Sequence, residues 1–187
     1  VNNAPLVQDL IAFVQEDGMV TITLVAYDED SDDNLLIFDI ISSTTHGSLV
    51  RNTRALDTWT YTPDSNYEGD DGFTYSVSDG DLSDTATVTI TISPVNDPPS
   101  ITLPESFTFS EDNELVVPFD GYLSDIDEDS LTLTVSGNDS ITVDIVDFGV
   151  TFSAEENWNG TEILTFSIND NQGRTIVSDE TGIIVTP

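Results

Sequence analysis

The stretch Pro94-Val95-Asn96-Asp97-Pro98-Pro99 lies at the midpoint of the 187-residue chain and decides its organisation. A weakened copy, Val1-Asn2-Asn3-Ala4-Pro5, opens the chain 94 residues earlier. The last two residues, Thr186-Pro187, match Ser93-Pro94, so a third copy is expected just past the end. A motif that returns at a fixed period is typical of tandem modules. We therefore expect two repeats, residues 1–97 and 98–187.

Hydrophobic residues alternate with threonine and serine in the first repeat, a period of two that is typical of half-buried β-strands. The alternating stretches are residues 20–26, 35–41, 59–61, 73–77 and 85–92. Turn-forming residues separate them, at 16–18, 28–34, 46–47, 63–72 and 78–84. No stretch has a helical period. Short strands with a turn about every ten residues predict an all-β fold, with one immunoglobulin-like Greek-key sandwich per repeat.

The second repeat follows the same order with a drifted sequence. The block that begins at Trp59 aligns without a gap with the block that begins at Val150. Both positions are therefore predicted to face the core. The same alignment pairs Tyr67 with Trp158 after a shared asparagine, which indicates a structural plug under a loop rather than an exposed platform for stacking sugars.

The charge balance is extreme: 36 acidic residues against 3 basic ones give a net charge of -33. Such a chain repels nucleic acid and anionic membranes. It has no cysteine for disulfides or thiolate metal sites. It also has no apolar run of the ~18 residues that a membrane helix needs. The acidity has two interpretations: a surface kept soluble in a salty medium, or clusters that divalent cations neutralise.

Two Asp-x-Asp pairs recur at the same place in the two repeats, each after a predicted strand. They are Asp28 with Asp30 and Asp125 with Asp127. Ca²⁺ takes six to eight oxygen ligands from carboxylates, amides and backbone carbonyls. Asp and Asn are also common in metal-free turns, so it is the recurrence that favours a cation site.

The segment from Ser76 through Asp79-Gly80 to Asn96-Asp97 resembles the closing strands and linker of a cadherin repeat, and most of all the cadherin-like tandem repeats of large bacterial surface proteins. The resemblance covers both repeats. It implies Ca²⁺ at the junction between consecutive repeats. The ligands that it implies there are Glu16, Asp64, Asn66, Glu68, Asn96, Asp97, Asp125, Asp127 and Asp170.

The chain departs from the cadherin pattern in ways that predict fewer ions, one or two, at this junction. Ser93 and Pro98 stand where the family linker has Asp and Asn, and the family's Leu-Asp-Arg-Glu motif is absent. A second, incomplete cluster is expected at the outer end of the first repeat, from Asn3, Asp28, Asp30 and Asp79. A third half-site is expected in the second repeat, from Glu111, Glu155 and Asn157.

The function expected from the resemblance is mechanical. Bound Ca²⁺ would stiffen a repeat array of an extracellular, bacterial cell-surface adhesin, as a monomer whose partners are neighbouring repeats and a glycan or protein receptor. Two alternatives stay open: a carbohydrate-binding module pair, and homophilic contact between cells. An enzyme is not expected, because the only histidine, His46, has no catalytic partner in the sequence and no carboxylate pair stands out among the 36 acids.

Overall fold

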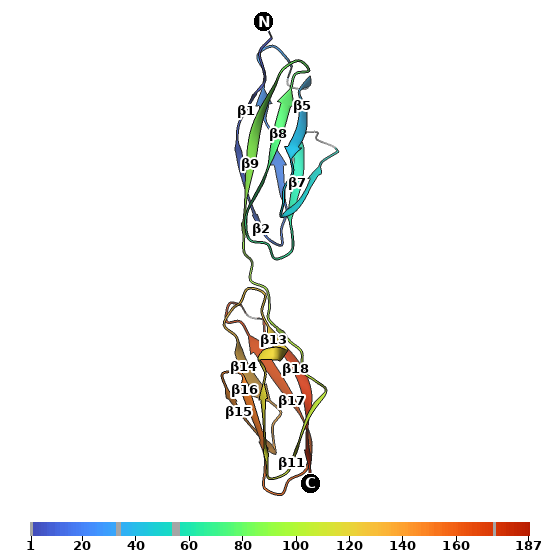
Figure 1. The fold of residues 1–187 in the computed structure, drawn as a ribbon, viewed down its shortest axis with the longest axis vertical. Helices are drawn as coiled ribbons and strands as arrows, with labels where there is room; N and C mark the ends of the chain where they lie inside the picture. Colours follow the sequence, from blue (N-terminus) through green and yellow to red (C-terminus); the bar gives the residue numbers. More distant parts are fainter. Residues whose placement is uncertain (1, 33–34, 54–56, 174) are drawn as a thin grey trace. The chain divides into compact units, whose positions relative to one another are not determined.

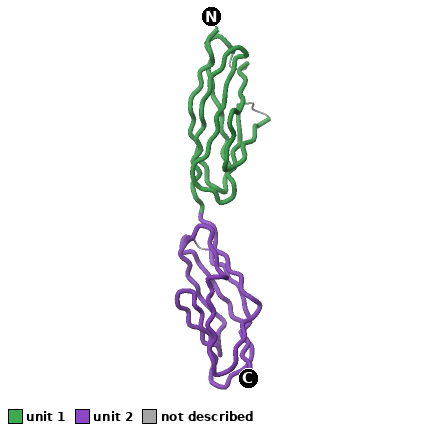
Figure 2. The backbone as a smooth tube through the Cα atoms, viewed as in Figure 1, with its two compact units in different colours: residues 1–95 green, residues 96–187 purple. Residues whose placement is uncertain are grey.

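The computed structural model describes residues 2–32, 35–53, 57–173 and 175–187. The chain folds into two compact units, Val1–Val95 and Asn96–Pro187 (Figure 2). The repeats expected from the sequence divide the chain two residues later. Each unit is a β-sandwich (Figure 1), so the predicted all-β class is confirmed. Within the described residues, no helix has the length and apolar character needed to cross a membrane.

The first unit places its strands in two facing sheets. The strands are β1 (Leu6–Val7), β2 (Leu10–Gln15), β3 (Val20–Thr23), β4 (Ala26–Tyr27), β5 (Ile37–Ser42), β6 (Gly47–Arg51), β7 (Thr58–Pro63), β8 (Gly69–Ser78) and β9 (Ser83–Ser93). One sheet has the order β2-β9-β8-β5 and the other β3-β7-β6, while β1 pairs with β4. Strand β2 runs parallel to β9, and the other pairs are antiparallel.

The second unit repeats this topology. Its elements are β10 (Ser100–Ile101), β11 (Ser106–Ser110), β12 (Glu114–Pro118), the 3-10 helix η2 (Asp120–Tyr122), β13 (Leu123–Ser124), β14 (Thr132–Ser136), β15 (Ile141–Val146), β16 (Gly149–Ala154), β17 (Gly160–Asn169) and β18 (Val177–Thr186). The sheet orders are β11-β18-β17-β14 and β12-β16-β15, with β10 paired to β13. Strand β11 is again the parallel partner, here of β18.

Each unit has its own core, formed by the inward residues of the long strands. In β8, for example, Phe73, Tyr75 and Val77 are buried and alternate with less buried residues. The aligned pair Tyr61 and Phe152 is fully buried. Burial of one such side chain stabilises a fold by about 1.5–3 kcal/mol. The period-two pattern therefore reports the two cores correctly.

The structure differs from the sequence-based expectation at several points: β1 and β6 were not predicted, and the stretch 20–26 is divided between β3 and β4. Strand β2 was not predicted, because its consecutive apolar residues do not alternate: Ile11 and Phe13 face outward, at 70% and 72% exposure. The turn predicted over residues 63–72 is shorter, since β7 extends to Pro63 and β8 begins at Gly69. Trp59 is only half buried, whereas its partner Val150 is fully buried.

Candidate metal centre

Three loops meet at one end of the second unit and bring acidic side chains together. The linker donates two hydrogen bonds: Asn96 Nδ2 to Asp170 Oδ2 at 2.9 Å, and the backbone N–H of Asp97 to Asp127 Oδ2 at 2.7 Å. Asp127 lies between β13 and β14, and Asp170 directly follows β17. The linker, the Asp-x-Asp loop and the loop after β17 are thus tied into one cluster.

One of the two carboxylate oxygens of Asp125 is used in a local turn. Its Oδ1 accepts the backbone N–H groups of Asp127 at 3.0 Å and Asp129 at 3.3 Å, as aspartates commonly do in turns. Its Oδ2 is buried and has no hydrogen-bond partner among the described residues. Burying a carboxylate oxygen without a partner costs free energy, and such groups are normally paired or bound to a metal. This orphaned oxygen fits a cation ligand.

Asp170 is the most buried acid of the cluster, at 1% exposure. Its Oδ1 accepts the backbone N–H groups of Gln172 at 3.0 Å and Gly173 at 3.4 Å. The hydrogen bond from Asn96, followed by that from Gln172, outweighs burial and lowers the pKa of Asp170 below its ordinary value. The carboxylate is therefore held in its charged form beside the linker.

Carboxylate oxygens of Asp125, Asp127 and Asp129 lie within 4.8 Å of one another. Two unit charges at that separation repel by about 1 kcal/mol in a water-like dielectric, and by about 3.5 kcal/mol at an effective dielectric of 20. Asp127 is exposed and the other two are half buried, so the lower figure applies to Asp127. An oxygen-rich set of this kind suits a hard cation such as Ca²⁺.

The first unit has nearly the same set of hydrogen bonds between its N-terminal segment and its acidic loops. Asn2 Nδ2 donates to Asp79 Oδ2 at 2.9 Å, and the backbone N–H of Asn3 donates to Asp30 Oδ2 at 2.7 Å. Asp28 Oδ1 accepts the N–H groups of Asp30 and Ser31, both at 2.7 Å. Its Oδ2 is again buried without a hydrogen-bond partner among the described residues, in a side chain that is 5% exposed.

The two clusters differ in charge. Asn3 occupies the place that Asp97 takes in the second unit, so the first cluster has one carboxylate fewer at the linker position. Asp79 otherwise matches Asp170: backbone hydrogen bonds from Leu82 and Asp81, with the contact from Asn2, lower its pKa. The shared geometry shows that both units position these residues in the same way.

Glu16 lies at the opposite end of the first unit and is 4% exposed. Its Oε1 accepts the backbone N–H of Val95 at 2.6 Å, which fixes the glutamate to the last residue of that unit. Asp64, Asn66 and Glu68 lie in the loop between β7 and β8, where all three are exposed. Among the described residues, no hydrogen bond joins these three to Glu16, and their convergence on a cation stays a prediction.

The corresponding end of the second unit is more closely connected. Asn159 Nδ2 donates to Glu111 Oε2 at 3.3 Å, and the backbone N–H of Asn157 donates to Asp112 Oδ1 at 3.4 Å. Glu155 accepts the N–H of Trp158 through its backbone carbonyl. Of the three residues expected there, Glu111 and Asn157 therefore take part in side-chain or loop contacts around β11 and β17.

Two residues of the clusters, Asn2 and Asp129, were not predicted from the sequence. A signal for Asn2 was present, because it aligns with Asn96 in the repeated linker motif. Asp129 gave no distinct signal, since it is one of several acids close together in the sequence. The tertiary structure places its carboxylate within 4.8 Å of those of Asp125 and Asp127, and its Oδ1 accepts a hydrogen bond from Gln172 Nε2 at 3.1 Å. Arg54 and Arg174, two of the three basic residues, lie outside the described residues.

Comparison with known proteins identifies the fold. Human protocadherin-24 EC1-2 matches with a TM-score of 0.64 and 15% identity, over 100% of this chain and 99% of that one. Protocadherin gamma B7 cadherin domains 1-4 match with a TM-score of 0.59 and 16% identity, over 99% of this chain and 50% of that one. At such identities the likeness shows the fold alone.

An endo-fucoidan hydrolase of glycoside hydrolase family 107 matches at 22% identity, with a TM-score of 0.39 that is too low to carry an argument. The match covers 97% of this chain and 28% of the hydrolase. No curated protein matches the chain. The model of the family described as "Bacterial Ig domain" matches residues 2–91 and again residues 96–182, nearly the whole length. The chain therefore belongs to the bacterial Ig domain family, as two tandem copies with a cadherin-like fold.

Proposed function

We propose that this domain pair binds Ca²⁺ at the linker end of the second unit, and that the ion stiffens a repeat array on the bacterial cell surface. The observation that carries the proposal is the buried Asp125 Oδ2, which has no hydrogen-bond partner among the described residues. The carboxylates of Asp127 and Asp129 stand within 4.8 Å of this side chain's ligand atom. Asp97 and Asp170 complete the candidate set through the linker contacts.

The residues themselves suggest how stiffening would arise. In the absence of cation, the clustered carboxylates repel one another, and the linker is held by two hydrogen bonds. Bound Ca²⁺ would supply positive charge that cancels this repulsion. Glu16 holds Val95, and Asp127 and Asp170 hold the two residues that follow it. Fixing the linker from both sides would restrict the rotation of one repeat about the next.

The proposed role is that of a non-catalytic spacer, which holds a binding module away from the cell surface. The tandem family match and the cadherin-like fold support this role, because both are typical of extracellular repeat arrays. Neighbouring repeats of the same chain would be the first partners. Extracellular Ca²⁺ modules bind at ~10⁻⁴–10⁻³ M, so such a spacer would be stiff in calcium-rich fluids and slack at cytosolic calcium levels.

Small-angle scattering of the 187-residue chain tests the proposal. The measurement compares 10 mM CaCl₂ with chelator at matched ionic strength. We expect a longer maximum dimension and lower flexibility with Ca²⁺. The double variant Asp125→Asn/Asp127→Asn should remain flexible in both conditions. Equal scattering of the original chain in both conditions, or an equal response from the double variant, would contradict the proposal.

A further inference from the structure

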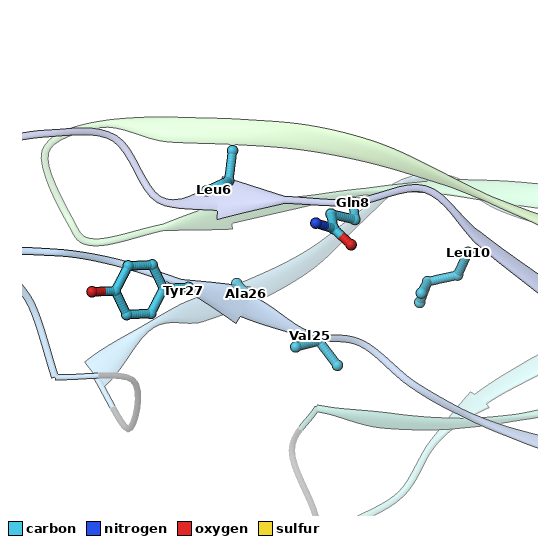
Figure 3. Close-up of a pocket in the computed structure, with 6 residues that line it drawn as sticks. All are labelled: Leu6, Gln8, Leu10, Val25, Ala26 and Tyr27. Atoms are coloured by element: carbon cyan, nitrogen blue, oxygen red, sulfur yellow. The ribbon is translucent and has the colours of Figure 1, made fainter.

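The first unit has an open apolar groove between two stretches of chain, one from β1 to the start of β2 and the other from Val25 through β4. Its volume is about 290 Å³, and Leu6, Gln8, Leu10, Val25, Ala26 and Tyr27 line it. Figure 3 shows the first three side chains on one side and the last three on the other. The groove opens where the chain leaves its pairing with β4 and crosses to the other sheet as β2. Leu6, Val25 and Tyr27 are 61%, 63% and 59% exposed.

The second unit shows that the fold does not need these exposed side chains. Leu6 pairs with Tyr27 across β1 and β4, and the matching pair across β10 and β13 is Ser100 with Ser124. The two serine hydroxyls are hydrogen bonded at 2.7 Å. The same strand pairing is thus made with polar side chains in one unit and with large apolar ones in the other. The fold therefore does not require apolar side chains at these positions. Together with Val25 they form a contiguous exposed apolar surface, a feature that commonly marks an interaction site.

The second unit has aromatic rings close to the corresponding pairing of β10 with β13. In the first unit, a single residue, Val25, connects buried Leu24 to Ala26, the first residue of β4. At the matching place in the second unit, the helix η2 (Asp120–Tyr122) connects buried Phe119 to Leu123, the first residue of β13. The ring of Tyr122 packs edge-on against Phe119, with 5.7 Å between the ring centroids.

A second ring packs on Tyr122. Phe107 lies 6.1 Å from Tyr122, centroid to centroid, and it also stacks on Phe119 and Phe152. The register of the parallel pairs places Ala12 at the position of Phe107, since these residues stand opposite Ile90 and Ile183 respectively. The first unit therefore lacks both rings, and an aromatic side chain has the chemistry of what is missing.

The charges around the groove restrict the occupant further. None of its six lining residues is charged. Asp9 lies between two of them in sequence and accepts the backbone N–H of Thr87, while Glu29 follows two residues after Tyr27 and accepts Asn3 Nδ2; both acids are exposed. The chain carries 36 acidic residues, so a second copy would meet strong like-charge repulsion, whereas a basic segment would be attracted.

We infer that the groove of the first unit binds an extended segment of another protein, one that inserts an aromatic side chain flanked by lysine or arginine. The ring would lie beside Val25, near the place that the helix η2 with Tyr122 takes in the second unit. The flanking cations would face the acids beside the groove. Aromatic anchors in apolar pockets commonly carry most of the energy of such contacts.

A peptide titration followed by amide NMR of the full chain tests this inference. The probe is a nine-residue serine-threonine peptide with a central phenylalanine and two lysines on each side. A second peptide has alanine at the centre, and a third has glutamates in place of the lysines. We expect the first peptide to shift the amide signals of Leu6, Gln8 and Val25, and both changes to weaken binding by about tenfold or more.

Variants locate the binding. The double variant Leu6→Ser/Tyr27→Ser gives the first unit the serine pair that the second unit has at these positions. It should weaken binding of the phenylalanine peptide by about tenfold or more. Val50→Thr removes a similarly exposed apolar group, at 61%, from β6, which does not line the groove, and should leave binding unchanged. The dispersion of the amide spectrum checks that each variant is folded.

Four results would overturn the inference. They are the absence of any shift at millimolar peptide, equal binding of the alanine peptide, shifts confined to the acidic loop after Tyr27, and groove shifts that grow with protein concentration without peptide. The last result would assign the groove to a second copy of the chain.

Discussion

Asp125→Asn is the substitution that probes the candidate metal centre most directly. The amide keeps an oxygen that can accept the two backbone N–H groups now bound by Oδ1. It replaces the buried, unpartnered Oδ2 by an NH₂ group and removes one negative charge. The local turn should therefore persist while the proposed cation ligand is lost. Two opposite effects on the stability of the second unit follow.

The first effect appears without Ca²⁺. Removing one of three clustered charges relieves about 1 kcal/mol of repulsion for each close pair in a water-like dielectric. The variant should then unfold at the same temperature as the original chain or at a slightly higher one. A carboxylate whose only role is structural would give the opposite result, a loss of stability in every condition.

The second effect appears with Ca²⁺. At a dissociation constant of about 1 mM, 10 mM Ca²⁺ stabilises the folded unit by about 1.4 kcal/mol. For a domain of this size that raises the melting temperature by about 6–11 °C. A doubly charged ion about 4 Å from a carboxylate is attracted to it by about 2 kcal/mol in a water-like dielectric. Replacing the carboxylate of Asp125 by an amide removes this attraction, which weakens Ca²⁺ binding about thirtyfold. The calcium-dependent rise should then fall to about 1 °C.

The two tryptophans allow the second unit to be observed alone. Trp59 lies in the first unit and Trp158 in the second, so a Trp59→Phe background leaves an indole only in the second unit. Thermal unfolding is followed by its fluorescence, with chelator and with 10 mM CaCl₂ at matched ionic strength. Asp144→Asn is the control, because it removes the same charge from an exposed position of β15. A calcium-dependent rise as large in Asp125→Asn as in this control would refute the reasoning.

Three further changes test the fold. Asp71 accepts hydrogen bonds from Tyr61 and three backbone N–H groups. Burial raises the pKa of Asp71, but these hydrogen bonds outweigh it and lower the pKa below its ordinary value. The stability that Asp71 contributes is therefore present above the unfolded-state pKa and is lost as pH falls through the folded-state pKa. In acid titrations followed by circular dichroism, Asp71→Asn should flatten this pH dependence and cost about 1–3 kcal/mol at pH 7; an unchanged acid transition would contradict this. Gly72→Ala would place a Cβ 2.6 Å from the backbone oxygen of Val88, so urea unfolding should show a loss of about 1–3 kcal/mol in the first unit, and a neutral result would exclude a rigid contact there. Phe119→Ala removes a fully buried ring that contacts several aromatic neighbours, and calorimetry should show the second unit weakened by about 3–5 kcal/mol while the first unit melts as before.

Much of the fold could be predicted because its signals are local. Alternation in residues 73–77 and 85–92 reports which side chains face the core, and a strand of period two needs no knowledge of its partner. The failures have a local cause as well. The residues of β2 are apolar on both faces, since Ile11 and Phe13 point to solvent, and a pattern without alternation does not reveal a strand.

The candidate site could be predicted only in part. The recurrence of Asp-x-Asp and of the linker motif pointed to Asp125, Asp127, Asn96 and Asp97 because these residues repeat in the sequence. The sequence could not select Asp129 from its acidic neighbours. It also could not show that the loop containing Asp64, Asn66 and Glu68 is exposed while Glu16 is buried against Val95.

The sequence by itself determined the tandem repeat, the β class and the acidic loops, since each depends on residues close together in the chain. Only the tertiary structure decided which oxygens converge, because contacts such as Asn96 with Asp170 join residues 74 positions apart. It also decided that Phe107 and Tyr122 pack against each other in the second unit, whereas Leu6, Val25 and Tyr27 line an open groove in the first. Packing between strands, rather than the pattern along any one strand, fixes what remains exposed.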